Sequence, residues 1–270
     1  MASYLVTGAS RGLGFEFIRQ LSEDPKNTVI GLVRDKASTI EKVNRELKQR
    51  ANLHILQADI TDYDALKASV EEVSKITGGG LDYLIANAAF VSNYSAWGTL
   101  TTLGEDPKRL GEDLLQSFNV NVVANIHLFN LYTPLILKGQ VKKVISISTG
   151  MTEIEFISRF GITSSSPYSI SKAGMNVAVA KYSAEYSKAG VLFLSISPGL
   201  VDTSTTAPTE TEIEGAKQMI AQFSEYAPGW KGPTTPESSV KDVLSVIRSK
   251  SVEAGDGGSF VSHLGNQQWL

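Results

Sequence analysis

Residues 3–14 read Ser3-Tyr-Leu-Val-Thr-Gly8-Ala-Ser-Arg-Gly12-Leu-Gly14. An apolar run enters three spaced glycines, and the amphipathic pattern Phe15-Glu-Phe-Ile-Arg-Gln-Leu follows them. This order predicts a strand, a glycine-rich turn and a helix, the arrangement in which backbone N–H groups and the positive end of a helix bind pyrophosphate. The spacing differs from the common G-x-G-x-x-G, so a turn that only closes a strand–helix corner is the alternative. The position of the glycines, after a strand and before a helix, favours dinucleotide binding.

Apolar runs alternate with helical patterns along the whole chain. Their apolar residues are mostly contiguous, which is typical of parallel strands buried on both faces. Strands are expected at Tyr4–Thr7, Thr28–Val33, Leu53–Ala58, Leu81–Ala86, Lys143–Ser148, Leu192–Ser197 and Ser259–Ser262, and helices at 12–22, 38–50, 62–76, 107–137, 167–188, 210–225 and 236–249. The alternation predicts an α/β fold: a single doubly wound, Rossmann-type parallel sheet of about seven strands with helices on both faces.

One nucleotide-binding domain is expected over residues 1–270, because no linker, repeat or low-complexity tract divides the chain. Two segments, 150–166 and 198–236, are expected to be irregular, and both follow predicted strand ends. Ligands bind outside the carboxyl ends of the strands in such sheets. We therefore expect these segments to shape a substrate pocket.

Composition narrows the possible functions. The chain is 42% hydrophobic and 20% charged with a net charge of −3, so neither nucleic acid nor a membrane is expected as a partner. The absence of cysteine excludes disulfides, thiolate metal sites and a cysteine nucleophile, and no metal is expected. The sequence contains no signal-peptide pattern and no apolar run long enough for a bilayer, so a cytoplasmic location is expected.

The end of the second predicted strand bears on cofactor choice. An acid at this strand end usually binds the ribose hydroxyls of NAD, whereas an arginine suits the 2′-phosphate of NADP. Val33 fills the position of the acid, Arg34 follows it, and Arg11 in the glycine turn can add a second guanidinium. NADP is therefore favoured over the alternative of two solvated arginines. If Asp35 rather than Arg34 faces the ribose, the preference reverses.

Two polar residues follow the next strands. Asp59 can accept a hydrogen bond from an adenine amino group, or can cap a helix near Thr61-Asp62. Asn87 can hold the sheet edge against a cofactor, or can simply make a turn. Both alternatives stay open in the sequence.

Tyr168 and Lys172 follow Pro167 at the beginning of a predicted helix. Residues four apart share a helix face, and a nearby ammonium favours tyrosinate over the phenol. This arrangement indicates a general acid or base that exchanges a proton with an alkoxide as hydride moves to or from the carbon. The alternative is a tyrosine and a lysine on a solvated helix.

Hydroxyl and amide groups elsewhere strengthen this interpretation. The fifth strand ends in Ser146-Ile-Ser148-Thr149, which places hydroxyls where a substrate carbonyl can be polarised. Asn121 lies in the middle of a predicted helix, where asparagine is a modest helix former and a partner is expected. Its alternative is a buried amide that only satisfies backbone groups.

The chain resembles the short-chain dehydrogenase/reductases over essentially all its length. The matches are Thr7-Gly8-x-x-x-Gly12-x-Gly14, Asp59, Asn87-Ala88, Asn121, Ser148/Thr149, Tyr168-x-x-x-Lys172 and Pro198-Gly199-x-x-x-Thr203. The resemblance implies NAD(P)-dependent oxidation or reduction. It implies that Tyr168 is the acid/base, Lys172 holds the nicotinamide ribose and lowers the pKa of the tyrosine, Asn121 orders a water in a proton relay, and Thr203 contacts the carboxamide. The nucleotide-binding residues expected are Gly8, Ser10, Arg11, Gly12, Leu13, Gly14, Arg34, Asp59, Ile60, Asn87, Tyr168, Lys172, Pro198, Gly199, Val201 and Thr203.

Some positions depart from the family pattern. The family usually has Asn and Gly where Ala86 and Ala89 stand. Thr149 aligns best with the catalytic serine and Ser148 precedes it, so either hydroxyl can serve. The segment from there to Tyr168 is longer than usual.

A closer resemblance is to fungal norsolorinic acid ketoreductase-like enzymes. It is carried by Tyr4-Leu-Val-Thr-Gly-Ala-Ser-Arg-Gly, Ala86-Asn-Ala-Ala89, Pro233-Thr-Thr and the tail Phe260-Val-x-His263-x-x-x-x-Gln268-Trp269. It implies reduction of a bulky aromatic or polyketide-like ketone or aldehyde by NADPH. The alternatives are an NAD(P)-dependent alcohol dehydrogenase that works in the oxidative direction, and a catalytically silent NADP-binding sensor or scaffold.

A homodimer is expected through helices 107–137 and 167–188. The first carries the apolar stripe Leu114, Phe118, Val122, Ile126 and Phe129, and the second carries the small residues Ala173, Gly174, Ala178, Ala180 and Ala184. The family's frequent pairing of these helices favours this interpretation. The alternative is that both stripes only face the sheet.

Overall fold

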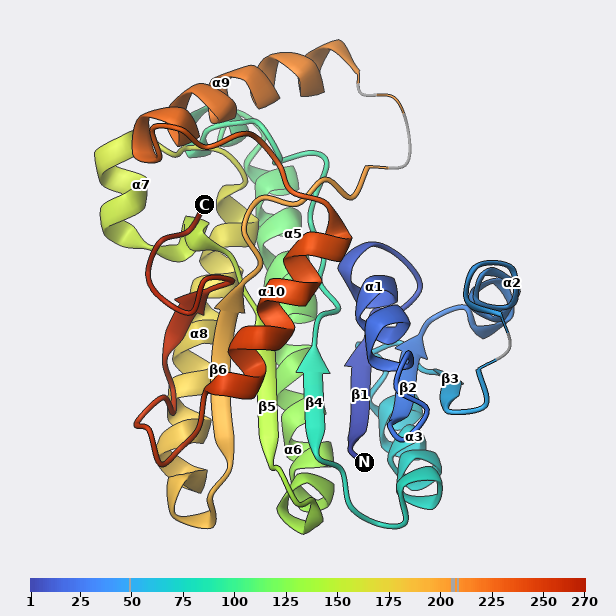
Figure 1. Ribbon diagram of the computed structural model, residues 1–270. Helices are drawn as coiled ribbons and strands as arrows, with labels where there is room; N and C mark the ends of the chain where they lie inside the picture. Colours follow the sequence, from blue (N-terminus) through green and yellow to red (C-terminus); the bar gives the residue numbers. More distant parts are fainter. Residues whose placement is uncertain (49, 205–206, 208) are drawn as a thin grey trace.

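The computed structural model describes residues 1–48, 50–204, 207 and 209–270. Within them the chain forms one seven-stranded sheet in the order β3-β2-β1-β4-β5-β6-β7, and every neighbouring pair is parallel (Figure 1). The strands are β1 (Ser3–Thr7), β2 (Thr28–Val33), β3 (Leu53–Gln57), β4 (Tyr83–Ala86), β5 (Lys143–Ile147), β6 (Leu192–Ser197) and β7 (Phe260–Ser262). All seven predicted strands are present, with ends within two residues of those expected.

The sheet reverses its direction of winding between β1 and β4. The chain moves from β1 outward to β3, returns to β4 on the other side of β1, and then moves outward to β7. Loops that leave β1 and β4 therefore diverge, and the crevice between them is where this kind of sheet binds nucleotides. The predicted Rossmann-type fold is confirmed.

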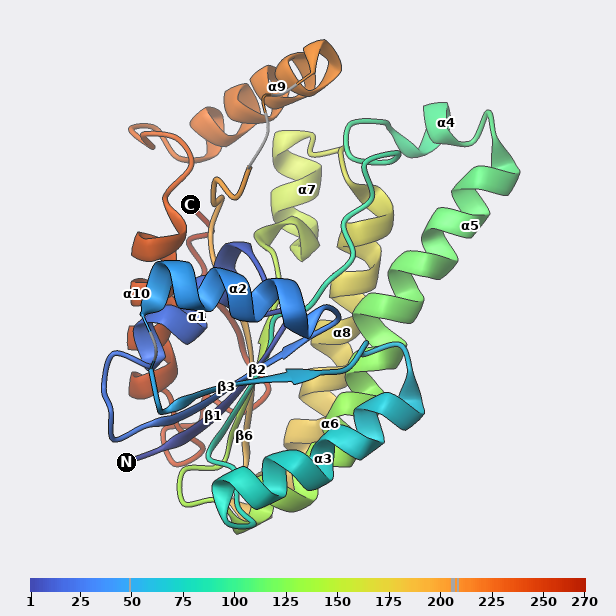
Figure 2. The same cartoon turned by 90° about the vertical axis from the view of Figure 1, so that its right-hand side faces the viewer.

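Helices cover both faces of the sheet, and Figure 2 shows α1 and α10 on one side and α3, α6 and α8 on the other. They are α1 (Gly12–Leu21), α2 (Lys36–Leu47), α3 (Tyr63–Thr77), α4 (Leu100–Leu103), α5 (Pro107–Phe118), α6 (Ala124–Lys138), α7 (Ile154–Phe160), α8 (Ser166–Tyr186), α9 (Glu210–Tyr226) and α10 (Pro236–Ser249). Short 3-10 turns lie at Gly150–Thr152 and Ser187–Ala189. Local sequence explains several starts: the side chains of Asp35, Asp62 and Thr235 accept backbone N–H bonds at the beginnings of α2, α3 and α10.

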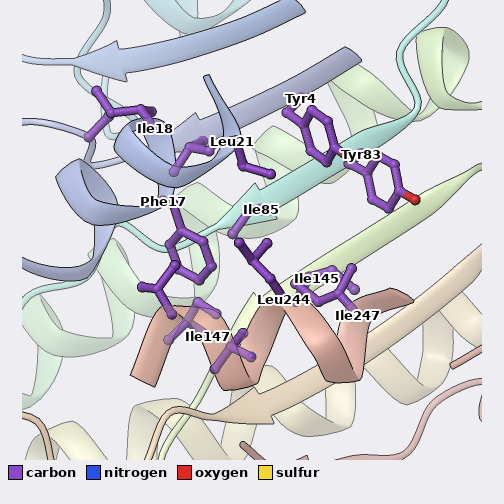
Figure 3. Packing of buried hydrophobic residues seen from close by; sticks show 14 of the residues in the cluster. Tyr4, Phe17, Ile18, Leu21, Tyr83, Ile85, Ile145, Ile147, Leu244 and Ile247 are labelled. Carbon is purple, nitrogen blue, oxygen red and sulfur yellow. The ribbon is translucent and has the colours of Figure 1, made fainter. Parts of the chain in front are cut away.

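Alternate residues of the strands point to opposite faces of the sheet and belong to two separate hydrophobic cores. Val6 belongs to the core under α1, α2 and α10, whereas its neighbour Leu5 belongs to the core under α3, α6 and α8. In Figure 3 the side chains of α1 and α10 pack against isoleucines of β4 and β5. Burial on both faces explains why the strands read as contiguous apolar runs.

Three segments differ from the sequence-based expectation. Segment 150–166 was expected to be irregular, but it contains the 3-10 turn and α7, which ends at Gly161 with φ of 63°. The short helix α4 was not anticipated. The helix expected over 107–137 is continuous but includes a π-helical turn at Asn119–Val123.

The two helices expected to dimerise pack against each other within one chain. A Cβ on Gly174 of α8 would lie 3.6 Å from Cε2 of Phe118 and 3.7 Å from Cγ2 of Val122. The small residue therefore permits close approach inside the protomer. By length and composition, Pro107–Lys138 would also pass as a membrane-spanning helix, but 56% of its most apolar window is buried inside the molecule, as in the core helix of a globular fold.

Candidate active site

The glycine turn is shaped for close backbone approach. Gly8 and Gly12 have φ of 69° and 53°, a region that favours glycine. A Cβ on Gly8 would lie 2.9 Å from Cα of Ala88, and a Cβ on Gly14 would overlap the carbonyl oxygen of Gly8. Arg11 is the N-cap of α1 and makes no side-chain capping bond, so the first N–H groups of that helix remain available for an anion. Ser10 and Leu13 lie in this same turn and first helical turn.

Asn87 joins the two strands that flank the crevice. Its Nδ2 donates to the carbonyl oxygen of Thr7 at 3.0 Å. The hydroxyl of Thr7 in return accepts the backbone N–H groups of Asn87 and Ala88 at 3.1 and 3.0 Å. Asn87 thus does more than form a turn: it holds the end of β4 against the glycine turn.

Arg34 and Asp35, at the end of β2, differ in their contacts. The Asp35 carboxylate accepts the backbone N–H of Ser38 at 3.1 Å and caps α2, and this hydrogen bond lowers its pKa. Arg34 is exposed at the end of β2. The acid that could have reversed the cofactor preference is therefore engaged by its own helix.

Asp59 makes a local turn at the end of β3. Its Oδ1 accepts the backbone N–H of Thr61 at 2.9 Å and the Thr61 hydroxyl at 2.8 Å. Asp62, rather than Asp59, caps α3. The adjoining Ile60 is buried in the core under α3 and α6.

The loop after β6 returns to the glycine turn. The carbonyl of Pro198 accepts the hydroxyl of Ser239 at 2.8 Å, and Gly199 has φ of 78°. Val201 pairs with Thr234 in an isolated parallel bridge. A Cβ on Gly12 would lie 3.4 Å from Cγ2 of Thr203, so this loop faces the beginning of α1 across the crevice.

Tyr168 and Lys172 share one face of α8 at the carboxyl end of β5. The Lys172 ammonium is buried and donates to the carbonyl oxygen of Ile147 at 2.7 Å, while it lies 5.9 Å from the centre of the Tyr168 ring. An ammonium has three donors, and this bond uses one of them. The other two can serve hydroxyl groups of a ligand.

Burial sets the pKa of both groups. It lowers the pKa of Lys172 to about 8 and raises the pKa of Tyr168 to about 12. Burial is the cause of the raised pKa of Tyr168 in this structure, and the lowering of that pKa by Lys172 stays a prediction. At neutral pH the phenol stays protonated.

The two candidate hydroxyls differ in what they bind. The Ser148 hydroxyl is buried and donates to Oδ1 of Asn176 at 2.8 Å, and Nδ2 of Asn176 donates to the Thr152 hydroxyl at 3.1 Å. The Thr149 hydroxyl accepts the backbone N–H of Met151 at 3.3 Å. A hydroxyl has one donor proton, so Ser148 has committed its proton and Thr149 has used only an acceptor position.

Asn121 lies in the π-helical turn and is fully buried. Its Oδ1 accepts the Phe90 N–H at 2.8 Å, and its Nδ2 donates to the Phe90 carbonyl and the Ser171 hydroxyl, both at 2.9 Å. This matches the alternative of a buried amide that satisfies backbone groups. A part for Asn121 in a proton relay stays a prediction.

Sequence reasoning missed an aromatic cluster above the sheet. In Figure 1, α7 and α9 lie beyond the carboxyl ends of β4, β5 and β6. Phe156, Phe223, Tyr226, Trp230 and Trp269 pack between these helices and the C-terminal tail. A Cβ on Gly150, next to Thr149, would lie 2.6 Å from Cβ of Trp269. The quoted tail ending in Gln268-Trp269 was the only signal in the sequence.

A cavity of about 550 Å³ opens beside this cluster, lined by Glu153, Phe160, Tyr226, Gln267 and Trp269 among others. None of the expected catalytic or nucleotide-binding residues lines it. The cavity is therefore not a candidate for the reaction site.

The glycine turn at the sheet reversal and the Tyr168–Lys172 pair at the end of β5 are the features expected of an oxidoreductase with a doubly wound sheet. The family model for short chain dehydrogenases matches residues 3–214. The chain belongs to this family.

The relatives agree over the full length. The short chain dehydrogenase virK of Hypocrea virens is 57% identical, and the short-chain dehydrogenase/reductase AacuF of Aspergillus aculeatus is 48% identical, each over 100% of both chains. Among solved structures, the NADPH-bound carbonyl reductase from chicken fatty liver superposes with a TM-score of 0.77 at 24% identity, and the carbonyl reductase Sniffer of D. melanogaster with 0.78 at 21%, both covering 98% of each chain. These structures share the fold of the chain.

Proposed function

We propose that this oxidoreductase reduces a ketone or aldehyde of a small molecule to an alcohol with NADPH. The observation that carries the proposal is the pairing of protonated Tyr168 with buried Lys172 beside an uncommitted hydroxyl, at the end of a crevice shaped for a dinucleotide. The nicotinamide supplies the hydride when the cofactor is bound. Every other step falls to the residues of this chain.

The nucleotide would lie along the crevice. Its phosphates would meet the N–H groups of the turn and first helical turn, and its adenine would lie beside Asp59 and Ile60. The Lys172 ammonium would hold the ribose next to the nicotinamide. The remaining expected contacts come from the loop after β6: Pro198, Gly199, Val201 and Thr203.

Tyr168 would donate its hydroxyl proton to the alkoxide that forms on the substrate. Burial favours the neutral phenol at neutral pH, which is the protonation state that reduction needs. Lys172 would orient the cofactor and stabilise the tyrosinate left behind. Asn121 would fix the helical turn beside them through Phe90 and Ser171.

Thr149 is the better candidate for polarising the carbonyl. Its proton can point to a substrate oxygen, whereas the proton of Ser148 is held by Asn176. Ser148 would act by fixing the end of β5 against α8. The choice agrees with the alignment of Thr149 with the catalytic serine of the family.

Three features support NADPH over NADH. Arg34 and Arg11 would flank the 2′-phosphate, and the competing Asp35 carboxylate caps α2. The solved structures of similar fold include one described as NADPH-bound and one, from Burkholderia cenocepacia, described as a complex with NADP. A phosphate between two guanidinium groups receives charge-assisted hydrogen bonds that NADH cannot use.

We assign the substrate to a bulky aromatic or polyketide-like class. The segments 150–166 and 198–236 carry α7 and α9, and these helices bring the aromatic cluster next to the end of β5. The indole of Trp97 also packs directly on Gly215 of α9, so aromatic groups support this helix at both ends. Such surroundings favour flat apolar substrates.

A homodimer through α5 and α8 and a cytoplasmic location complete the proposal. Leu115 and Val177 are 74% and 61% exposed, and Phe118 and Ile170 on the same two helices are about half exposed. Exposed apolar groups gathered on neighbouring helices mark an association surface. The net charge of −3 gives no attraction to nucleic acid or to an anionic membrane.

The test is consumption of NADPH by the purified protein with a panel of aromatic and aliphatic ketones, followed by the loss of NADPH absorbance. We expect turnover with at least one bulky aromatic ketone, and slower turnover with NADH. A Tyr168→Phe protein serves as the matched control, because it retains the fold and lacks the acid. Cofactor binding without turnover on any ketone or alcohol would favour a sensor or scaffold instead.

A further inference from the structure

A lysine on α2 reaches the glycine turn from the side of β2. The Lys42 ammonium lies 3.4 Å from the carbonyl oxygen of Ser10 and 4.0 Å from the centre of the Phe15 ring. Phe15 is buried in the core under α1 and α2. The ammonium is therefore held beside the turn by a fixed aromatic face rather than extended into solvent.

The charge of Lys42 is not matched by an acid. The ion pairs formed by the described residues include neither Lys42 nor Arg11 nor Arg34. Among the acids of α2, Glu41 is exposed and forms none of these ion pairs, and Glu46 pairs with Arg45, while Asp35 caps the helix. Lys42 thus lies beside the glycine turn that carries Arg11, and the same turn is bonded through the N–H of Gly8 to Leu32 of β2, the strand that Arg34 follows.

We infer that Lys42 is a third cation of the subsite for the 2′-phosphate, and so determines cofactor specificity together with Arg34 and Arg11. This inference rests on the proposed use of NADPH. A phosphomonoester near neutral pH carries more than one negative charge and has three acceptor oxygens. Two guanidinium groups therefore leave acceptor positions for a third donor. Lysine suits the role of third donor because its compact ammonium has three N–H groups and the Ser10 carbonyl accepts only one of them.

A purely structural role makes a different prediction. If Lys42 only tethers the turn through Ser10, its loss weakens every nucleotide equally, because all of them use the turn. If it reads the 2′-phosphate, its loss weakens only ligands that carry that group. Binding of dinucleotide fragments separates the two without any turnover.

The experiment measures the Kd of 2′,5′-ADP, 5′-AMP, NADPH and NADH by calorimetry for the wild type and for Lys42→Met. Methionine keeps the length of the side chain and its contact with Phe15. We expect the Kd of 2′,5′-ADP and NADPH to rise roughly 5- to 20-fold, the range for losing one contact to a charged group, with little change for 5′-AMP and NADH. Lys42→Arg should keep most of the discrimination.

Lys67→Met, on α3 across the sheet, is the control for removing one exposed positive charge. It should leave all four dissociation constants near their wild-type values. Equal weakening of 2′,5′-ADP and 5′-AMP by Lys42→Met, or no weakening of either, would overturn the inference and leave the proposed function intact. A wild-type protein that binds 5′-AMP as tightly as 2′,5′-ADP would overturn both.

Discussion

Tyr168 is the residue on which the proposed reaction depends. Replacing Tyr168 by phenylalanine removes one oxygen, and the ring keeps its packing. Because general acid catalysis typically supplies ~10²–10⁴-fold, we expect turnover to fall by that factor while the Kd of NADPH changes little. Single-turnover kinetics and calorimetry measure the two quantities. Near-normal ketone reduction by the folded variant would remove Tyr168 from the mechanism.

Thr149 and Ser148 can be told apart by their donor protons. Thr149→Val removes the uncommitted hydroxyl, and we expect turnover to fall by ~10²–10³, the range for losing a carbonyl-polarising donor. Ser148→Ala removes a bond to Asn176 and should have a smaller effect on turnover and a larger one on the melting temperature. The reverse order of effects on turnover would assign the role to Ser148.

Lys172 makes the stability of the protein depend on pH. Its folded pKa of about 8 lies below the ordinary value for lysine. Between the two values the unfolded chain binds more protons than the folded one, so the free energy of unfolding rises with pH in that window. Urea unfolding at pH 7.5 and at about pH 9.5 should show this gain in the wild type and a smaller gain in Lys172→Met. Unfolded tyrosines, with an ordinary pKa of ~10, are partly ionised at this upper limit, but their contribution is common to both proteins and cancels in the comparison.

The same gain in both proteins would assign the effect to another group. Lys143 is the main candidate, since burial lowers its pKa as well. Comparing the two proteins, rather than reading the wild type alone, separates Lys172 from this background.

At the scale of elements, the strands and most of the helices could be predicted from the sequence, because burial and local hydrogen bonds determine them. The strands were recognisable because both faces of the sheet are covered, and the helix expected from residue 62 is capped by Asp62, whereas the cap of α2 at Asp35 was not anticipated. The helix α7 was not recognisable, because it has only seven residues and its Ile154 is 81% exposed. The π-helical turn at Asn121 depends on contacts with Phe90 and Ser171, which are distant in sequence.

In the candidate site, too, local patterns could be predicted from the sequence, whereas features that depend on distant contacts could not. The glycine turn and the Tyr168–Lys172 spacing are local patterns, and the structure brings these elements to one edge of the sheet. The choice between Ser148 and Thr149 depends on Asn176, one helical turn after Lys172 on α8. The raised pKa of Tyr168 depends on burial, which no spacing reveals.

The C-terminal tail and α9 form one unit above the site. The Tyr226 hydroxyl accepts the backbone N–H of Trp269 at 3.1 Å and donates to the carbonyl of Gln267 at 3.4 Å. Trp269 also stacks on Phe260 at 4.4 Å between ring centres. Tyr226 therefore fastens the tail to the helix that borders the proposed substrate pocket.

We expect Tyr226→Phe to raise the KM for a bulky ketone roughly 2- to 10-fold, the effect of losing one or two hydrogen bonds, and to leave the Kd of NADPH unchanged. Steady-state kinetics and calorimetry provide both values. Tyr63→Phe, at an exposed tyrosine of α3, is the matched control. A Tyr226→Phe protein that loses ketone and cofactor affinity together would indicate a general loosening of the fold instead.

At the scale of the whole molecule, α5 and α8 expose apolar side chains that a second copy of the chain could bury. Phe118 and Val122 pack against Gly174 inside the protomer, but Leu115 and Val177 face outward. Burying such side chains is favourable by about 1.5–3 kcal/mol each, and a twofold axis would bury each of them twice. We expect the wild type to sediment as a dimer.

Val177→Glu should shift the protein to monomers in sedimentation velocity experiments, because a dimer would place the two carboxylates in an apolar interface. Ile154→Glu adds the same charge at an even more exposed isoleucine of α7, away from this surface, and should leave the dimer intact. If both variants sediment like the wild type, the α5–α8 surface is not the interface. A wild type that sediments as a monomer at all concentrations would contradict the predicted homodimer. Loss of the dimer in Val177→Glu alone, with NADPH binding retained, would place the contact on these two helices and separate it from the fold of each protomer.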